Sequence, residues 1–165
     1  MPPRVLVSAD MSGNAPAMNE DENMATVNNS ININAPVEKV FAYVTDPMNL
    51  PEWIDSLSEV TDVTGSGVGQ RHRWTYKMIG IPLRGETTAS EHVPNERWVL
   101  DSKGGATSIW TFTFAPHEGG TKLNMNVDYT IPVPVLGKLA ENLVLKRNQR
   151  EAVMWMENLK ERVEG

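Results

Sequence analysis

The segment from Ile33 to Trp53 (INAPVEKVFAYVTDPMNLPEW) constrains the fold more than any other part of this chain. Pro36 suits the first turn of a helix, because its missing N–H has no helical partner there. The following apolar residues recur at helical spacing and share one face: Val37, Val40, Phe41 and Val44. The pattern predicts a helix over about 36–45 that stops at Asp46-Pro47. Residues 50–53 (LPEW) predict a second, short helical turn that returns an indole to the core.

A strand precedes this segment and six strands follow it. From Ala25 to Asn34, one side of an alternating run carries Val27, Asn29, Ile31 and Ile33, which is typical of a strand with one buried face. The later candidates end at glycine- and proline-rich turns and cover 56–64, 70–79, 83–93, 97–102, 106–115 and 121–131. Because parallel neighbours need long crossovers, such short connections predict an antiparallel sheet.

The chain ends in a predicted long helix, from about Pro134 to Val163, which would be roughly 45 Å long. Its apolar positions are Leu136, Leu139, Ala140, Leu143, Val144, Ala152, Val153, Met156, Leu159 and Val163. Polar residues interrupt this stripe at 147–150 (RNQR), which an ordinary packed helix would not do. Asn148 is the best candidate for a polar group that points inward, and Arg147 is a weaker one. The arginines are otherwise expected to be solvated, with only their aliphatic stems packed.

Composition excludes several classes of function. At 165 residues the chain is expected to form one domain. It has no cysteine, which removes disulfides, thiol nucleophiles and zinc–thiolate sites and fits a reducing compartment. A formal net charge of −6 argues against a nucleic-acid partner. No apolar run approaches the ~18 residues of a membrane span, and no signal peptide is evident, so we expect a cytoplasmic protein without stable membrane insertion.

The first 23 residues differ from the rest in composition. They are rich in Pro, Ser, Asn and acidic residues and show no sustained period, which predicts a disordered extension before a domain that covers 24–165. Two alternatives remain open: the run Val5-Leu6-Val7 could dock as a capping segment, or Met24 could be the true start.

The order of these elements, together with several short motifs, resembles the START-like (SRPBCC) superfamily, and most closely its polyketide cyclase/dehydrase and coenzyme-Q-binding branches. The motifs are 35–41 (APVEKVF), 51–53 (PEW), 65–69 (GSGVG), 110–112 (WTF) and 119–121 (GGT). The resemblance covers about residues 25–163. It implies an α+β helix-grip fold, in which a curved seven-stranded antiparallel sheet, with two short helices after its first strand, wraps around a long C-terminal helix. It also implies a cavity between them for a lipid, sterol, polyketide, hormone or quinone.

Alternation within three strands predicts the wall of such a cavity. The residues that share its face are His72, Trp74, Tyr76, Met78, Trp110, Phe112, Phe114, Leu123, Met125, Val127 and Tyr129. An equally weighted interpretation is a solid core. Met suits a variable apolar guest, and a few polar groups in an apolar pocket are typical of a small-molecule site. The predicted ligand-binding residues are therefore Trp74, Tyr76, Met78, Trp110, Phe112, Met125, Tyr129 and Asn148.

Signals for catalysis are weak. His72 shares a face with Trp74 and Tyr76, so His72 and Tyr76 are the candidate proton-transfer residues, although a rim or structural role for His72 is the simpler interpretation. Glu86 and Glu91 have opposite parity, so only one of them can face inward, and paired carboxylate catalysis is poorly supported. The histidines lack metal-ligand spacing, and 65–69 joins strands rather than opening a helix, so neither a metal site nor a cofactor is predicted. We interpret 65–69 as a hairpin, or a lid at the cavity mouth.

Three functions remain in competition. The first is binding of a small hydrophobic molecule, such as a lipid, quinone or polyketide-like compound, in the cavity. The second is a cyclase or dehydratase that acts on a ketone-bearing substrate, so the chain is not assigned as an enzyme or a non-enzyme. The third is an interaction module whose groove receives a protein partner, and a homodimer is also compatible with the sequence.

Overall fold

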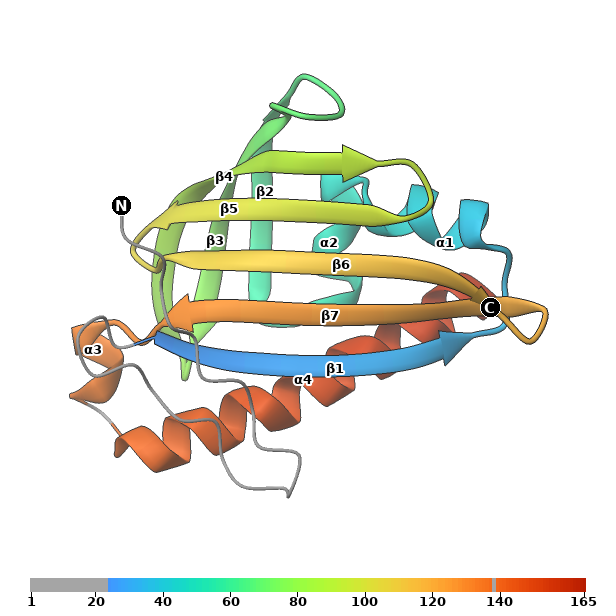
Figure 1. The fold of residues 1–165 in the computed structure, drawn as a ribbon. Coiled ribbons are helices and arrows are strands. Elements are labelled where there is room, and N and C mark those ends of the chain that lie inside the picture. Colours follow the sequence, from blue (N-terminus) through green and yellow to red (C-terminus); the bar gives the residue numbers. More distant parts are fainter. Residues whose placement is uncertain (1–23, 138) are drawn as a thin grey trace.

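A curved antiparallel sheet of seven strands forms one layer of the structure (Figure 1). The computed structural model describes residues 24–137 and 139–165, so the predicted disorder of residues 1–23 lies outside the described residues. The strands occur in the order β1-β7-β6-β5-β4-β3-β2. Their bounds are β1 (Met24–Ile33), β2 (Leu57–Thr64), β3 (Arg71–Met78), β4 (Ile81–Val93), β5 (Arg97–Gly104), β6 (Ser108–His117) and β7 (Gly120–Thr130). The predicted sheet is confirmed.

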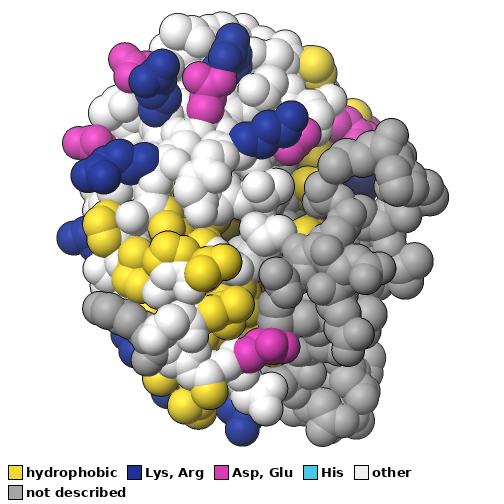
Figure 2. Space-filling model, turned by 90° about the vertical axis from the view of Figure 1, so that its left-hand side faces the viewer, with side chains coloured by type: hydrophobic (Ala, Val, Ile, Leu, Met, Phe, Trp, Pro, Cys, Tyr) yellow, Lys and Arg dark blue, Asp and Glu magenta, His cyan; other side chains and the backbone are white. Residues whose placement is uncertain are grey.

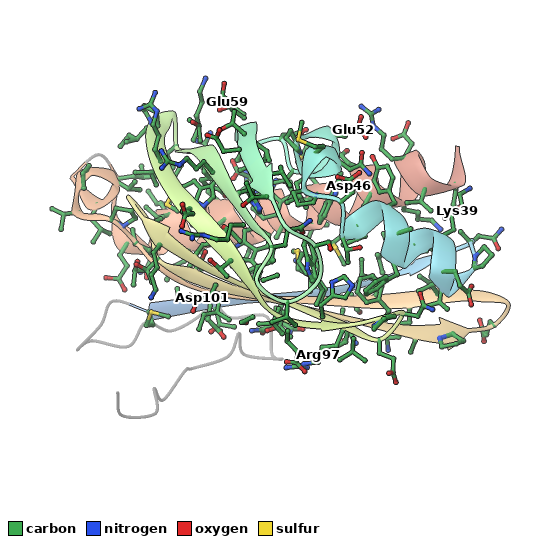
Figure 3. All side chains as sticks on the ribbon, turned by 90° about the horizontal axis from the view of Figure 1, so that it is seen from above. Lys39, Asp46, Glu52, Glu59, Arg97 and Asp101 are labelled. Atoms are coloured by element: carbon green, nitrogen blue, oxygen red, sulfur yellow. The ribbon has the colours of Figure 1, made fainter. Side chains whose placement is uncertain are left out.

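The helices α1, α2 and α4 lie against the concave face of the sheet, and α3 lies at one end of it (Figures 1 and 3). They are α1 (Val37–Val44), the 3₁₀ turn η1 (Pro47–Asn49), α2 (Leu50–Trp53), α3 (Val133–Leu136) and α4 (Glu141–Glu164). Charged residues of the sheet point away from the helices, including Glu59 on β2 and Arg97 and Asp101 on β5. The inner face therefore holds the core, and the predicted helix-grip architecture is confirmed.

The single long C-terminal helix predicted from Pro134 to Val163 is wrong at its start. The structure has a short α3, a break, and then the 24 residues of α4, which span roughly 36 Å rather than 45 Å. Ala140 has ψ of 142°, an extended conformation that cannot continue a helix, and Gly137 ends α3. The apolar residues within 136–140 suggested that one helix runs through this region. The helix is interrupted there by a change in backbone conformation, which leaves no mark in the pattern of polar and apolar residues.

The inward face of α4 also differs from the predicted stripe. Leu143 and Val153 are 51% and 46% exposed, so they do not belong to it. Trp155, which the stripe omitted, is buried. The buried positions of α4 are Val144, Leu145, Asn148, Ala152, Trp155, Met156, Leu159 and Val163. Asn148 thus faces inward, as predicted, whereas the side chain of Arg147 is 53% exposed and lies 3.6 Å from Glu151.

Two local irregularities set which side chains face inward along β4. The hairpin from β3 turns at Ile79-Gly80, both with positive φ, so Ile81 and Pro82 belong to the strand rather than to the predicted turn. The register with β5 then shifts between Ala89 and Glu91, a β-bulge that adds one residue and reverses the parity beyond it. Glu91 therefore pairs with Arg97 on the outer surface, at 2.9 Å.

Glu86 also lies on the outer surface, in an ion pair with Arg71. Opposite parity allowed one of these two carboxylates to face inward, but the bulge in β4 leaves both outside. Paired carboxylate chemistry inside the sheet has no structural basis.

Glycine on β4 makes room for the largest side chain of β3. Gly85 lies opposite Trp74 on β3 and opposite Gly104 on β5. A β-carbon on Gly85 would collide with the carbonyl oxygen of Lys103 and with the six-membered ring of Trp74. The missing side chain lets the indole lie across β4 and fixes Trp74 in the inner wall.

We expect the Gly85→Ala variant to be less stable than the wild type by at least about 2 kcal/mol, because the added methyl group meets both backbone and indole. The measurement is the free energy of unfolding from urea titrations. Gly137→Ala is the control, since its φ is −70° and its nearest contact would be 3.6 Å away, so its stability should be unchanged or slightly higher. Equal stability of the two variants would contradict this account of Gly85.

Candidate functional site

A cavity lies between the inner face of the sheet and α4, with a volume of about 90 Å³. Its wall is formed mainly by apolar and aromatic residues from β1, β2, β3, β5, β6, β7, α2 and α4. They include Val27, Leu50, Ile54, Leu57, Trp74, Met78, Leu100, Trp110, Phe112, Val127, Ala152 and Trp155. The predicted wall therefore borders an empty space as well as a core.

A chain of aromatic contacts crosses this space. Trp98 stacks on Phe112, with ring centroids 5.5 Å apart, and Phe112 lies 6.2 Å from Trp110. Trp110 stacks on Trp155 of α4 at 5.8 Å, and Trp155 meets Tyr76 of β3 edge-on at 6.2 Å. The chain thus links three strands to the helix and keeps the two layers apart at this depth.

The structure brings most of the predicted site residues together. His72, Trp74, Tyr76, Met78, Trp110, Phe112, Tyr129 and Asn148 all line the cavity. Met125 does not: it is fully buried and pairs with Phe112 and Asn29 in the packed part of the sheet. Trp155 is the principal aromatic residue that sequence reasoning missed. Its signal was present, because 148, 152, 155 and 159 follow helical spacing.

Asn148 and Tyr129 form the contact between helix and sheet at the polar side of the cavity. The amide Nδ2 of Asn148 donates to the hydroxyl oxygen of Tyr129 at 3.0 Å. Burial raises the pKa of Tyr129 to about 12, although the hydrogen bond from Asn148 opposes the shift. Tyr129 therefore keeps its proton at neutral pH, and that proton is not used by the bond from Asn148.

A row of polar side chains crosses five strands at the same level. His72 pairs with Thr87, Thr87 with Ser102, Ser102 with Ser108, and Ser108 with Tyr129. All five line the cavity. The hydroxyls of Thr87 and Ser102 are 2.5 Å apart, and the indole Nε1 of Trp110 donates to Ser108 at 3.0 Å.

Sequence reasoning found His72 and Tyr129 but missed the three hydroxyl residues between them. Their alignment depends on the register of four strand pairs, and in the sequence each is an isolated Thr or Ser. Only the hairpin lengths carried any signal of this register.

His72 is held as a neutral imidazole. It is 4% exposed, and burial lowers its pKa to about 4. Burial, helped by the negative charge of Glu151, raises the pKa of Tyr76 above its usual range. At neutral pH the cavity therefore presents a neutral histidine and two protonated tyrosines, and among residues 24–137 and 139–165 neither Lys nor Arg lines it.

The other polar features lie elsewhere. The predicted lid, 65–69, does not line the aromatic cavity: Ser66 and Gly67 border a separate open cleft of about 460 Å³ that also contacts His92. His117, at the β6–β7 turn, is exposed. Within residues 24–137 and 139–165, no group of His, Asp and Glu side chains could hold a metal ion. Across the same residues, no helix has the length and apolar character needed to cross a membrane.

One end of the molecule combines the cavity with an apolar surface. Met78 and Ala106, which line the cavity, lie next to the β3–β4 and β5–β6 turns, at the end that carries α3 (Figure 1). Seen from that end, hydrophobic side chains gather near the centre of the surface, with charged side chains around them (Figure 2). Val133 of α3 and Leu143 of α4 are exposed by 77% and 51%.

Comparisons with solved structures find the same fold. TTHA0849 from Thermus thermophilus is 26% identical, with a TM-score of 0.73 over 84% of this chain and 96% of that chain. CV1439 from Chromobacterium violaceum is 21% identical, with a TM-score of 0.66 over 85% and 98%. The Zhui aromatase/cyclase from a Streptomyces species is 14% identical, with a TM-score of 0.68 over 86% and 94%. Among curated proteins, none matches this sequence.

The fold and its partly enclosed cavity define a helix-grip protein with an internal space lined by aromatic residues. A sequence profile matches residues 24–164, which is nearly the whole described chain. The chain belongs to the polyketide cyclase/dehydrase and lipid transport family. The resemblance found in the sequence is confirmed.

The buried His72 should make stability depend on pH. Its folded pKa of about 4 lies below the unfolded value of 6.5, so between these values the unfolded chain binds the extra proton and stability falls as the pH falls. The loss is at most roughly 3 kcal/mol and is complete near pH 4. Urea titrations at pH 7 and pH 4.5 measure it. The His72→Gln variant should lose less stability than the wild type over this interval. Equal losses of stability in the wild type and in His72→Gln would show that His72 is not the source of the pH dependence.

Proposed function

We propose that this protein binds a small hydrophobic molecule in the cavity between the sheet and α4. The observation that carries the proposal is a space bordered by large aromatic side chains on most sides and by a row of polar groups on one. A packed core would leave neither an empty space nor a row of polar side chains facing it. Trp74, Tyr76, Met78, Trp110, Phe112, Tyr129 and Asn148 are the proposed contacts, and Asn148 would orient the ligand.

The size of the cavity favours a compact ligand. An apolar cavity of roughly 150 Å³ is known to hold benzene, so the smaller space of about 90 Å³ sets a molecule of one ring as the upper limit. A long acyl chain or a multi-ring guest would require the wall to move. Among the hydrophobic compounds considered from the sequence, a small ring system therefore has more support than an extended lipid.

Filling the cavity should abolish binding. Ala152 lines the space, is fully buried and lies on α4, so Ala152→Leu would place three additional carbons in it. We expect the affinity for toluene, measured by NMR titration, to fall at least about tenfold, while the melting temperature stays equal or rises because a void is filled. Val153→Leu, the neighbouring exposed position, is the matched control and should bind normally. Undiminished binding by Ala152→Leu would place the ligand elsewhere.

A second candidate function is supported by the position of His72 and Tyr76 in the same cavity. A neutral imidazole can accept a proton and a protonated tyrosine can donate one, which is the pair of roles needed for enolisation or dehydration of a ketone. We propose His72 as base and Tyr76 as acid in this alternative, in which the chain is a cyclase or dehydratase.

The two candidates differ in what substitution of these residues does. If the protein is an enzyme, His72→Ala and Tyr76→Phe should each lower turnover of a ketone-bearing substrate about 100-fold or more, with smaller effects on its binding. The comparison of kcat with KM measures this. Turnover that survives both substitutions would remove His72 and Tyr76 from the mechanism. If the wild type itself shows no turnover of ketone-bearing compounds that it binds, binding remains the supported function.

A further inference from the structure

Negative charge is concentrated in one segment of the chain. Residues 40–70 contain five acidic residues and neither Lys nor Arg, so they carry nearly all of the formal net charge of −6. The five residues are Asp46, Glu52, Asp55, Glu59 and Asp62, and each is exposed. Within the described part of the chain, none of the five forms an ion pair with a Lys or Arg side chain. Uncompensated charge of this kind creates a local potential that attracts cations.

The open cleft described above borders this segment. Its wall comes from the junction of α1 and η1, the end of β2, the β2–β3 loop and β4, and its volume is about 460 Å³. Asp46 supplies a negative charge to the wall. The ring of His92 also belongs to the wall and meets Phe41 edge-on, with ring centroids 5.2 Å apart. None of the described residues that line this cleft also lines the aromatic cavity, so the two sites are separate.

Two exposed apolar side chains flank the cleft. Met48 follows Pro47 in η1 and is 58% exposed, and Val68 follows Gly67 in the β2–β3 loop and is 67% exposed. Both preceding residues, Pro47 and Gly67, line the cleft. Methionine is flexible and polarizable, so it adapts to partners of different shape. Apolar side chains at the centre with charged ones around them are typical of a protein–protein interface.

The β2–β3 loop is held in place before any partner binds. The N–H of Gly69 donates to the carbonyl oxygen of Ala89 on β4 at 2.8 Å, and the N–H of Gln70 donates to that of Gly67 at 3.2 Å. The side chain of Gln70 adds a third hydrogen bond, from Nε2 to the carbonyl oxygen of Gly65 at 3.2 Å. Docking therefore does not have to fix this loop, which reduces the entropy lost on association.

The distribution of charge identifies the kind of partner. The acidic residues extend from Asp46 through α2 to β2, and the eight residues of β2 alone span roughly 26 Å. Of the five, only Asp46 lines the cleft, so a small cation there would leave the others without a counter-charge. A nucleic acid or an anionic membrane would be repelled. A protein segment with several cations matches this length, and it also offers an apolar side chain to the space between Met48 and Val68.

We propose that the cleft is a docking site for a basic protein segment in which Lys or Arg residues flank an apolar side chain. The apolar side chain lies in the cleft between Met48 and Val68, and the flanking cations lie against Asp46 and Asp62. This interaction does not depend on the aromatic cavity or on the proposed function. Because the charges are exposed, the attraction weakens as the salt concentration rises.

Three heptapeptides test the proposal, because they separate the effect of charge from that of apolar contact. GKKLKKG carries a leucine between two pairs of lysines, GKKGKKG lacks the leucine, and GEELEEG reverses the charge. Binding would be followed by NMR titration of the full-length protein at low salt. We expect GKKLKKG to bind with a Kd of about 1 mM or less and to shift the amide signals of Ser66, Gly67 and His92.

The affinities of the other two peptides separate the two contributions. GKKGKKG should bind at least about fivefold more weakly than GKKLKKG, because it buries no apolar side chain. GEELEEG should not bind. Raising the salt concentration from about 20 mM to about 200 mM should weaken the binding of GKKLKKG at least about threefold.

Substitutions on the protein locate the contact. Met48→Ser and Val68→Ser each remove an exposed apolar side chain, so they should leave the fold intact and weaken the binding of GKKLKKG at least about threefold. Val153→Ser on α4, where the side chain is 46% exposed, is the matched control and should bind normally. Asp46→Asn removes the charge but keeps the oxygen that accepts from the N–H of Met48, and it should also weaken binding. Glu157→Gln, at an exposed position of α4, should not.

The other possible results overturn the proposal. No amide shifts at about 5 mM GKKLKKG would do so, and so would equal affinities of GKKLKKG and GKKGKKG, which would show attraction by charge alone. Spermine is the last probe: if this tetra-amine binds as tightly as GKKLKKG, the site takes small polycations and not a protein segment. Binding that is unchanged in both Met48→Ser and Val68→Ser would place the peptide elsewhere. None of these results affects the toluene titration of the aromatic cavity.

Discussion

The stacked pair formed by Trp110 of β6 and Trp155 of α4 is the contact on which the cavity depends. Their centroids are 5.8 Å apart with planes at 21°, and each ring has a further aromatic neighbour, Phe112 on one side and Tyr76 on the other. Aromatic contacts contribute about 0.5–1.5 kcal/mol each beyond the area they bury. Because these rings are rigid and wide, they hold the helix off the sheet and cannot fold down into the space beside them.

The packing around the cavity also leaves buried polar atoms without hydrogen-bond partners, which a purely structural core would avoid. The indole nitrogens of Trp74 and Trp155 and the Oδ1 of Asn148 are buried without a hydrogen-bond partner in the described structure. A buried polar group left unpaired destabilises a protein by about 1–3 kcal/mol. Several such groups around one cavity indicate that packing there is not optimised for stability alone, which is characteristic of functional sites.

Much of the fold could be predicted from the sequence, because its signals are local. The Pro36 helix start, the alternation that placed Trp74 and Trp110 on one face, and the short turns all depend on neighbouring residues. The break before α4 and the bulge near Ser90 could not, since each depends on a backbone conformation that polarity does not reveal. The bulge alone reversed the side on which Glu91 lies.

The residues of the candidate site show the same difference between local signals and features that depend on the folded backbone. Its aromatic residues were predictable by parity, whereas the line from Thr87 through Ser102 to Ser108 exists only after three strands have been set in register. Structural relatives share the fold at 14–26% identity, so the helix-grip architecture by itself does not determine a ligand. What distinguishes this chain is the side chains that face the space. In the part of the chain that the structure describes, these side chains combine an aromatic wall with a row of hydroxyl groups, and neither Lys nor Arg is among them.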